Sequence, residues 1–510
     1  VSHHAATGEI VNGEDDNIIL RSIREVNASI PEPPHNKTSM VFVPSNLMPD
    51  WTATLCDIFG QSAVVAFQKP TQNLSCFIGS TRRVILLSSS ILQNDVKSGF
   101  VQNALPWLNL VADEAHIGFG SRLDSNTKTN AAKVDAISRI AVTATPDQGD
   151  VRYMVAMLEF CGVKLPNKVS EQEIQRIAKN RMFRVSRDDA KDDIGDFVPP
   201  DPDYVTLLVD ESDEVDNPKN AAFSRMIAAV NRFENQGASA KTMTKIAVSR
   251  QAVVFPAAIF ESAPKTKAPK TKKATKATKA TNGPPPPPAR LNLRSHLRKI
   301  ANDLPSFDEL PEFSPVILKI VEDIKTRPAS EKHVVMCHFT EEINAMSAAL
   351  QREGFRAPFI YNGQQTLEGK NTYIEIFKSP VEPNEQSAPI LICNIQCGSV
   401  GLNLQCASNI YFPTSDWNHQ KELQAIGRLH RSGQKQVVRV VFVRHYKDAT
   451  DASMQAIQCR KISHCNDVLG ESSDVARHIK RLQEGEQLVE KIAKEKLSKE
   501  AGGGEGAEGG

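Results

Sequence analysis

Short apolar runs recur in the first part of the chain, and small or polar residues follow each of them at once. The runs are Met40–Val43, Val84–Leu87, Leu108–Ala112 and Ile140–Val142. Near-continuous apolar runs of this length are typical of strands in a parallel sheet that is covered on both faces. The pattern therefore predicts an α/β fold, with functional groups beyond the carboxyl ends of the strands.

The same rhythm returns in the second half of the chain. We expect an amphipathic helix at Glu341–Arg352 and strands at His333–Cys337, Phe359–Tyr361, Ile390–Cys393, Asn409–Phe412 and Val437–Val443. Residues 161–262 carry no recurring strand pattern and are expected to be helical. The predicted organisation is a polar segment at 1–39, a first lobe at 40–160, a helical insertion at 161–262, a linker at 263–290, a second lobe at 291–460, and a charged helix with a Gly-rich tail at 461–510.

The predicted linker differs sharply in composition from the segments on either side. Residues 263–281 contain seven lysines and no acidic residue, and five prolines follow at 284–288. Such a segment cannot bury a core and is expected to be disordered and partly extended. Two interpretations fit it equally well. In one, the segment is a tether to the DNA backbone or a nuclear import signal; in the other, it is a solubilising spacer.

Overall composition limits the classes of function. Basic and acidic residues balance, at 61 and 60, so any nucleic-acid surface must be a local patch. No apolar run reaches the roughly 18 residues of a membrane span, so no membrane contact is expected. The nine cysteines include no Cys-x2-Cys pair, which favours free thiols in a reducing compartment over a zinc site or disulfide framework.

Two distant motifs carry the main candidate chemistry. Arg428 and Arg431 are three residues apart, so on a helix both side chains would project from one face and suit a transferring phosphoryl group. Alone, such a pair is more often a solvated helix face. Asp113 and Glu114 end an apolar run and are candidates to hold Mg²⁺ and to orient water, although a solvated acidic loop is the alternative. Together the motifs predict an ATPase site split between two lobes.

Three further motifs are less specific. Thr143 and Thr145 end the next predicted strand, where their hydroxyls could contact Glu114 or phosphates, or simply cap a turn. Gly401 lies in a glycine-bearing turn, Gly398–Leu404, that suits a phosphate contact but is also an ordinary strand-to-helix turn. Trp417, within Asp-Trp-Asn, is either a stacking surface or a packing residue.

Taken in order, these motifs resemble the Swi/Snf-type ATPases of helicase superfamily two. The resemblance covers roughly residues 40–460 and is most specific in the sequence Gln-x-x-Gly-Arg-x-His-Arg-x-Gly-Gln at 424–434; Val43-Pro44-Ser45 with Trp51 adds to it. It implies two RecA-like lobes that close on ATP and Mg²⁺. It assigns catalysis to Asp113, Glu114, Arg428 and Arg431, metal binding to Asp113, nucleotide support to Gly401, Gln424 and Gln434, contacts with the DNA backbone to Ser45, Ser89, Ser399 and Asn403, and coupling to Thr143 and Thr145.

The sequence also departs from the resemblance. No Gly-x4-Gly-Lys-Ser/Thr loop occurs in these 510 residues, so we expect the chain to begin just after that loop and to be inactive in isolation. His419 replaces the usual proline after Asp-Trp-Asn. The predicted function is an ATP-dependent translocase on duplex DNA, located in the nucleus, with chromatin proteins as further partners. A non-catalytic two-lobe DNA-binding or scaffold protein and an RNA-dependent helicase are the alternatives.

Overall fold

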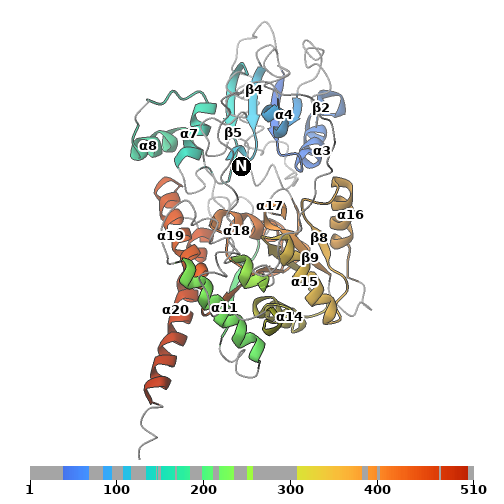
Figure 1. The fold of residues 1–510 in the computed structure, drawn as a ribbon. Coiled ribbons are helices and arrows are strands. Elements are labelled where there is room, and N and C mark those ends of the chain that lie inside the picture. Colours follow the sequence, from blue (N-terminus) through green and yellow to red (C-terminus); the bar gives the residue numbers. More distant parts are fainter. Residues whose placement is uncertain are drawn as a thin grey trace, which may run out of the picture.

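Two parallel β-sheets with helices on their faces organise the chain (Figure 1). The computed structural model describes residues 38–67, 84–94, 107–116, 134–144, 146, 151–166, 169–183, 198–210, 217–234, 250–256, 307–381, 389–398, 402–469 and 473–502. The predicted class of two RecA-like α/β lobes is confirmed. The predicted linker at 263–290 lies outside the described residues, and the domain boundaries remain predictions.

The sheet of the first lobe has the strand order β2-β3-β1-β4-β5. Its strands are β1 (Ser39–Val43), β2 (Val64–Phe67), β3 (Val84–Ser88), β4 (Trp107–Ala112) and β5 (Ala136–Ala141). Four of them overlap the predicted runs, although β5 begins four residues before the run Ile140–Val142. The strand β2 was not predicted, although its four residues are all apolar; just its two ends are buried.

Alternating side chains of the first sheet enter two separate cores. Phe42 and Leu110 pack on one face with the helix α7 (Val151–Phe160). Val41 and Val111 pack on the other face with the helix α3 (Met48–Phe59). Because both faces are covered, polar side chains can leave the sheet only at the strand ends, where a candidate site was expected. The helices α4 (Ser89–Asn94) and α8 (Glu171–Arg181) complete the labelled helices of this lobe in Figure 1.

The sheet of the second lobe has the order β6-β11-β10-β7-β9-β8, and all its pairings are parallel. Its strands are β6 (Asp203–Val209), β7 (His333–Cys337), β8 (Phe359–Tyr361), β9 (Ile390–Asn394), β10 (Asn409–Phe412) and β11 (Arg439–His445). The strands predicted for this lobe are confirmed, with β11 shifted by two residues. Helices cover both faces of this sheet as well.

The prediction that residues 161–262 form a helical insertion was wrong in one respect. Asp203–Val209 is the strand β6, which pairs with β11 along its full length. The helix α11 (Pro218–Glu234) and residues 252–254 also pack into the core of the second lobe, as the green segment in Figure 1 shows. The strand was missed because it is a lone apolar run whose pairing partner comes more than two hundred residues later, so no local repetition reveals it.

Helices of the second lobe bring distant segments together. They are α14 (Pro315–Lys325), α15 (Thr340–Arg352), α16 (Leu367–Lys378), α17 (Ile395–Gly398), α18 (His419–Ile426), α19 (Ala449–Leu469) and α20 (Ser473–Gly502). The helix α15 confirms the amphipathic helix predicted there. The helix α19 contacts α8 on one side and both α18 and α20 on the other. Among the described residues, no helix combines the length and the apolar character needed to cross a bilayer.

Candidate active site

The acidic side of the candidate site begins directly at the end of β4. The backbone N–H of Asp113 donates to the Phe42 carbonyl at 2.8 Å, which extends the strand pairing by one residue. The Asp113 carboxylate is buried and accepts hydrogen bonds from the Trp51 indole at 2.9 Å and from the Glu114 backbone at 2.8 Å. Burial raises the pKa of Asp113, and these two hydrogen bonds oppose the rise. Trp51 thereby fixes the orientation of Asp113.

Glu114 occupies an unusual backbone position. Its φ is 46°, and within the described part of the chain it is the residue other than glycine that has a positive φ. Such a conformation costs on the order of 1 kcal/mol or more and is concentrated at functional sites. Burial and the neighbouring charge of Asp113 raise the pKa of Glu114 to about 7, while Arg428 opposes this rise. A carboxyl group with a pKa near 7 is well suited to accept a proton at neutral pH.

His116 connects the ends of two neighbouring strands. Its Nδ1 lies 2.7 Å from the Thr143 hydroxyl, which follows β5, and 3.5 Å from Glu114 Oε2. Burial, with a smaller contribution from Lys421, lowers the pKa of His116 to about 4, so the ring is neutral at pH 7. The contact with Glu114 is therefore not an ion pair at neutral pH. Thr143 thus contacts His116 beside Glu114, and Thr145 lies outside the described residues.

The arginine side of the site, residues 427–434, lies after a helix rather than on it. The helix α18 ends at Ile426 with Gly427 as its C-cap, and Arg428 and Arg431 follow in tight turns. The expectation that both arginines project from one helical face was wrong, because the glycine ends the helix before either arginine. Both side chains are nevertheless buried. Hereafter residues 427–434 are called the arginine segment.

Charges from the two lobes meet at Arg428. Burial lowers the pKa of Arg428, and the negative charges of Glu114, Asp113 and Asp50 oppose this, in that order. These three carboxylates belong to the first lobe, and charges that are buried are screened by water much less than exposed ones. The structure thus brings together the acids of the first lobe and an arginine of the second, which were predicted to share one pocket.

Asp50 was not among the predicted site residues. It lies in the first turn of α3, where an acidic residue ordinarily serves the helix N-terminus, so its sequence context gave no other signal. Partial loss of water raises the pKa of Asp50, whereas the charges of Lys378, Arg431 and Arg428 oppose the rise. Asp50 therefore places a third carboxylate of the first lobe against the arginine segment.

The two glutamines that flank the arginines differ from each other in burial. Gln434 is buried, and its amide N–H group donates to the carbonyls of Gln405 at 2.9 Å, Ala407 at 3.1 Å and Leu429 at 3.3 Å. These three hydrogen bonds indicate that Gln434 supports the arginine segment and does not contact a nucleotide directly. Gln424 is half-buried on α18. Gly401 lies outside the described residues.

The residues assigned to DNA contacts lie at strand ends and in an exposed turn. Ser45 follows β1, and its hydroxyl lies 2.6 Å from that of Ser88 at the end of β3. Ser89 opens α4 and is half-buried. Asn403 is exposed, and its side-chain oxygen Oδ1 accepts a hydrogen bond from the Gln405 backbone N–H at 3.2 Å. Ser399 lies outside the described residues.

Carboxylate oxygens at the site fit the requirements of Mg²⁺. Within the described ranges, no group of three or more His, Cys, Asp or Glu side chains is arranged to hold a metal ion. Mg²⁺ in nucleotide sites needs only one or two carboxylates besides phosphate and water. Asp113 supplies a fixed carboxylate, and the buried Glu114 Oε2 accepts no hydrogen bond. The donor set therefore suits a hard divalent cation that arrives with a phosphate.

Comparisons with known proteins show what this chain is similar to. Residues 316–433 match the helicase conserved C-terminal domain. The chain is 34% identical to the DNA repair protein RAD5B of Arabidopsis thaliana over 148 residues, which are 28% of this chain and 11% of that protein. It is 21% identical to the DNA repair and recombination protein RAD54B of Gallus gallus over 441 residues, covering 79% of this chain and 45% of that protein.

Among solved structures, the Sulfolobus solfataricus SWI2/SNF2 ATPase core in complex with dsDNA is similar, with 14% identity, a TM-score of 0.33 and coverage of 91% of this chain and 89% of that one. The helicase domain and the sequence relatives confirm the resemblance to the Swi/Snf-type helicase-like ATPases of superfamily two. The chain spans less than half the length of the two curated relatives described above.

Proposed function

We infer that the protein containing this chain is a Swi/Snf-type ATP-dependent translocase that couples ATP hydrolysis to movement on duplex DNA. The observation that carries this proposal is that Arg428, buried in the second lobe, interacts electrostatically with Glu114 and Asp113 of the first lobe. A scaffold has no need to bury opposite charges from two lobes at one place, because isolating such charges from water is costly. A phosphoryl-transfer site requires this arrangement.

Each residue has a distinct chemical role in the proposal. Bound Mg²⁺ would supply a Lewis acid that balances charge on the phosphates of ATP. Asp113, held by Trp51, offers a carboxylate in a fixed orientation for that ion. Glu114, whose pKa of about 7 lies near neutral pH, accepts a proton from the attacking water. Arg428 and Arg431 stabilise the negative charge that spreads over the phosphoryl oxygens in the transition state.

The contact between His116 and Thr143 is the proposed coupling element. The distance between His116 Nδ1 and the Thr143 hydroxyl is 2.7 Å, and this contact joins the ends of β4 and β5 beside Glu114. Because Glu114 Oε2 lies 3.5 Å from His116 Nδ1, a movement of the Glu114 carboxyl group would reach the next strand end through His116. Serines 45 and 89 lie beyond the ends of β1 and β3, where hydroxyls can contact a DNA backbone without reading its sequence. Thr145, Ser399 and Asn403 remain in these proposed roles.

Duplex DNA is the proposed partner, and the nucleus is the proposed location. Both curated relatives described above carry DNA repair in their names. Chromatin proteins are proposed as further partners. For the isolated chain we expect negligible hydrolysis, because its 510 residues contain no Gly-x4-Gly-Lys-Ser/Thr loop to cradle the phosphates.

The deciding experiment measures ATP turnover by the full-length natural protein without nucleic acid, with duplex DNA and with RNA. We expect stimulation by duplex DNA, and we expect Arg431→Ala to lower the stimulated turnover on the order of 10³-fold, the effect of losing an arginine finger. Arg460→Ala, at an exposed position on α19, is the matched control and should behave as wild type.

Three results would contradict parts of the proposal. Unchanged turnover in Arg431→Ala would refute the role of that arginine. Stimulation by RNA but not by duplex DNA would favour the RNA-dependent helicase. Absence of any turnover would favour the non-catalytic scaffold.

A further inference from the structure

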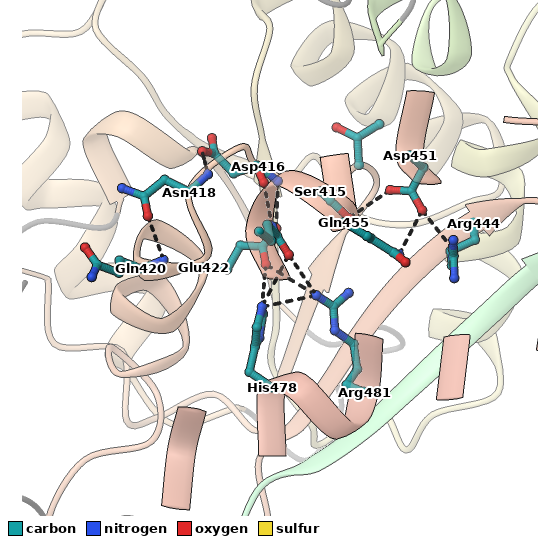
Figure 2. Close-up of polar contacts among 12 residues, drawn as sticks. Ser415, Asp416, Asn418, Gln420, Glu422, Arg444, Asp451, Gln455, His478 and Arg481 are labelled. Carbon is teal, nitrogen blue, oxygen red and sulfur yellow. Dashed lines mark hydrogen bonds and ion pairs between the residues drawn. The ribbon is translucent and has the colours of Figure 1, made fainter. Parts of the chain in front are cut away.

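The fully buried carboxylate of Glu422, on the helix that leads into the arginine segment, joins three separate parts of the second lobe (Figure 2). Glu422 of α18 accepts hydrogen bonds through Oε1 from the Asp416 backbone at 2.6 Å and from the Gln458 amide of α19 at 3.0 Å. Its Oε2 lies 3.3 Å from His478 Nε2 and 3.5 Å from a terminal nitrogen of Arg481, both on α20. One side chain thus ties the loop before α18 to α19 and α20.

Arg481 supplies the positive charge that balances Glu422. Burial and the charge of Arg481 lower the pKa of His478 far below its usual value, so His478 is neutral. The Arg481 guanidinium lies 3.7 Å from the centre of the Phe442 ring, which itself stacks on Phe412 at 4.6 Å. An arginine held between an aromatic face and a carboxylate has little freedom to move.

A glycine on α20 shows that this helix is fitted closely to the lobe. A Cβ atom at Gly485 would lie 2.8 Å from a terminal nitrogen of Arg444. Arg444 Nε donates to Asp451 at 2.8 Å, and Asp451 accepts from the Ser415 hydroxyl at 2.8 Å. The docked turns of α20 therefore also support the loop that precedes α18.

The position of α18 determines where the arginines point. Its N-cap is Asn418 and it ends at Ile426, after which the Arg428 backbone N–H donates to the Ala425 carbonyl at 3.1 Å. The arginine segment thus continues from the helix without an intervening loop. Any shift or rotation of α18 moves both guanidinium groups relative to the acids of the first lobe.

We propose that Arg481 and His478 of α20 are positioning residues for the arginine segment and act through Glu422; this role rests on the proposed function. A buried ion pair is rarely more stabilising than apolar residues of similar volume, whereas it does specify one arrangement of the groups that it joins. The docked turns of α20 bury His478 and Arg481, whereas later turns are largely exposed, as the lower helix in Figure 1 shows. The docked part of α20 also packs against β6 and α19.

The first test measures ATP turnover by the full-length natural protein with Arg481→Met. We expect kcat to fall at least tenfold with little change in KM for ATP, because a displacement of about 1 Å in a catalytic group costs as much as 10²-fold. Lys480→Met is the control, since Lys480 is exposed on the same helix and pairs only loosely with Glu484 at 3.7 Å. It should retain wild-type kcat.

A double variant separates positioning from general destabilisation. If Arg481 acts through the arginines, adding Arg481→Met to Arg431→Ala lowers kcat by a smaller factor than Arg481→Met does in the wild-type protein. Losses that multiply in the double variant would indicate an independent structural effect and would overturn the proposal.

The second test does not depend on turnover. Hydrogen exchange of the backbone amides in residues 419–431 of the 510-residue chain should be faster in Arg481→Met and unchanged in Lys480→Met. If Arg481→Met does not fold, Arg481→Lys replaces it in both tests. Wild-type exchange in this segment overturns the positioning role, even where turnover falls. Absence of turnover in the wild-type protein would refute the proposed function, while the exchange result would still decide whether α20 positions the segment.

Discussion

The two lobes hold their halves of the candidate site in different ways. In the first lobe, Asp113 and Glu114 follow directly from a buried central strand, and the pairing of β4 with β1 already places them. In the second lobe, Arg428 and Arg431 lie in turns after a helix, and a buried polar network holds the helix in place. A strand end is positioned by its own sheet, whereas a turn needs support from other segments.

Loss of the proton acceptor in the first lobe should have the largest effect. Glu114→Gln keeps the size of the side chain but cannot accept a proton, so we expect DNA-stimulated kcat of the full-length protein to fall about 10²- to 10⁴-fold. The measurement is steady-state ATP turnover, with Glu171→Gln at an exposed position on α8 as control. Retention of more than a tenth of wild-type kcat would refute the assigned role of Glu114.

Disruption of the network in the second lobe should instead appear as lost stability. Arg444→Met removes the charged partner of the buried Asp451, and breaking a buried ion pair from one side costs about 3 to 5 kcal/mol. Native-state hydrogen exchange of the amides in β10 and β11 measures this free energy in the 510-residue chain.

Arg460→Met at an exposed site on the same lobe should change the free energy by less than about 0.5 kcal/mol. Equal effects of the two variants would show that the network does not stabilise the second lobe.

The pH dependence of turnover gives a smaller effect that tests the environment of Glu114 in the first lobe. Burial and Asp113 raise the pKa of Glu114 to about 7, so its protonated form, which cannot accept a proton, persists to higher pH than in an ordinary glutamic acid. We therefore expect kcat of the full-length protein to rise with pH up to about 7 and then level off. Below that pH it should fall by up to about tenfold per unit. A kcat that stays constant from pH 8 down to pH 5.5 would contradict the placement of this carboxyl group.

Much of the α/β framework could be predicted from local pattern. Strands such as Val84–Ser88 and Ile390–Asn394 are buried on both faces and therefore appear as continuous apolar runs. The two missed strands are apolar too, but they are less completely buried. The strand β2 is short with an exposed middle, and β6 is an edge strand with one fully buried residue. Each pairs with a strand that is distant in the sequence, and a local sequence pattern does not predict such a pairing.

The candidate site divides in the same way. Residue type and spacing identified Asp113, Glu114, Arg428 and Arg431, because permanent charges beside apolar runs are unusual enough to notice. Asp50 was missed, since an acid in a first helical turn is commonplace. His478 and Arg481 were missed because they belong to a highly charged helix, where a solvated surface was the natural interpretation, although both are buried.

The amino-acid sequence alone determined the two α/β lobes and the identity of the charged groups, since both follow from short-range pattern and from side-chain chemistry. Only the tertiary structure decided that Trp51 orients Asp113, that Gly427 ends α18 before the arginines, and that α20 balances Glu422. The physical reason is that burial and partner choice depend on segments far apart in the chain. A charged side chain looks the same in the sequence whether water or another buried side chain surrounds it.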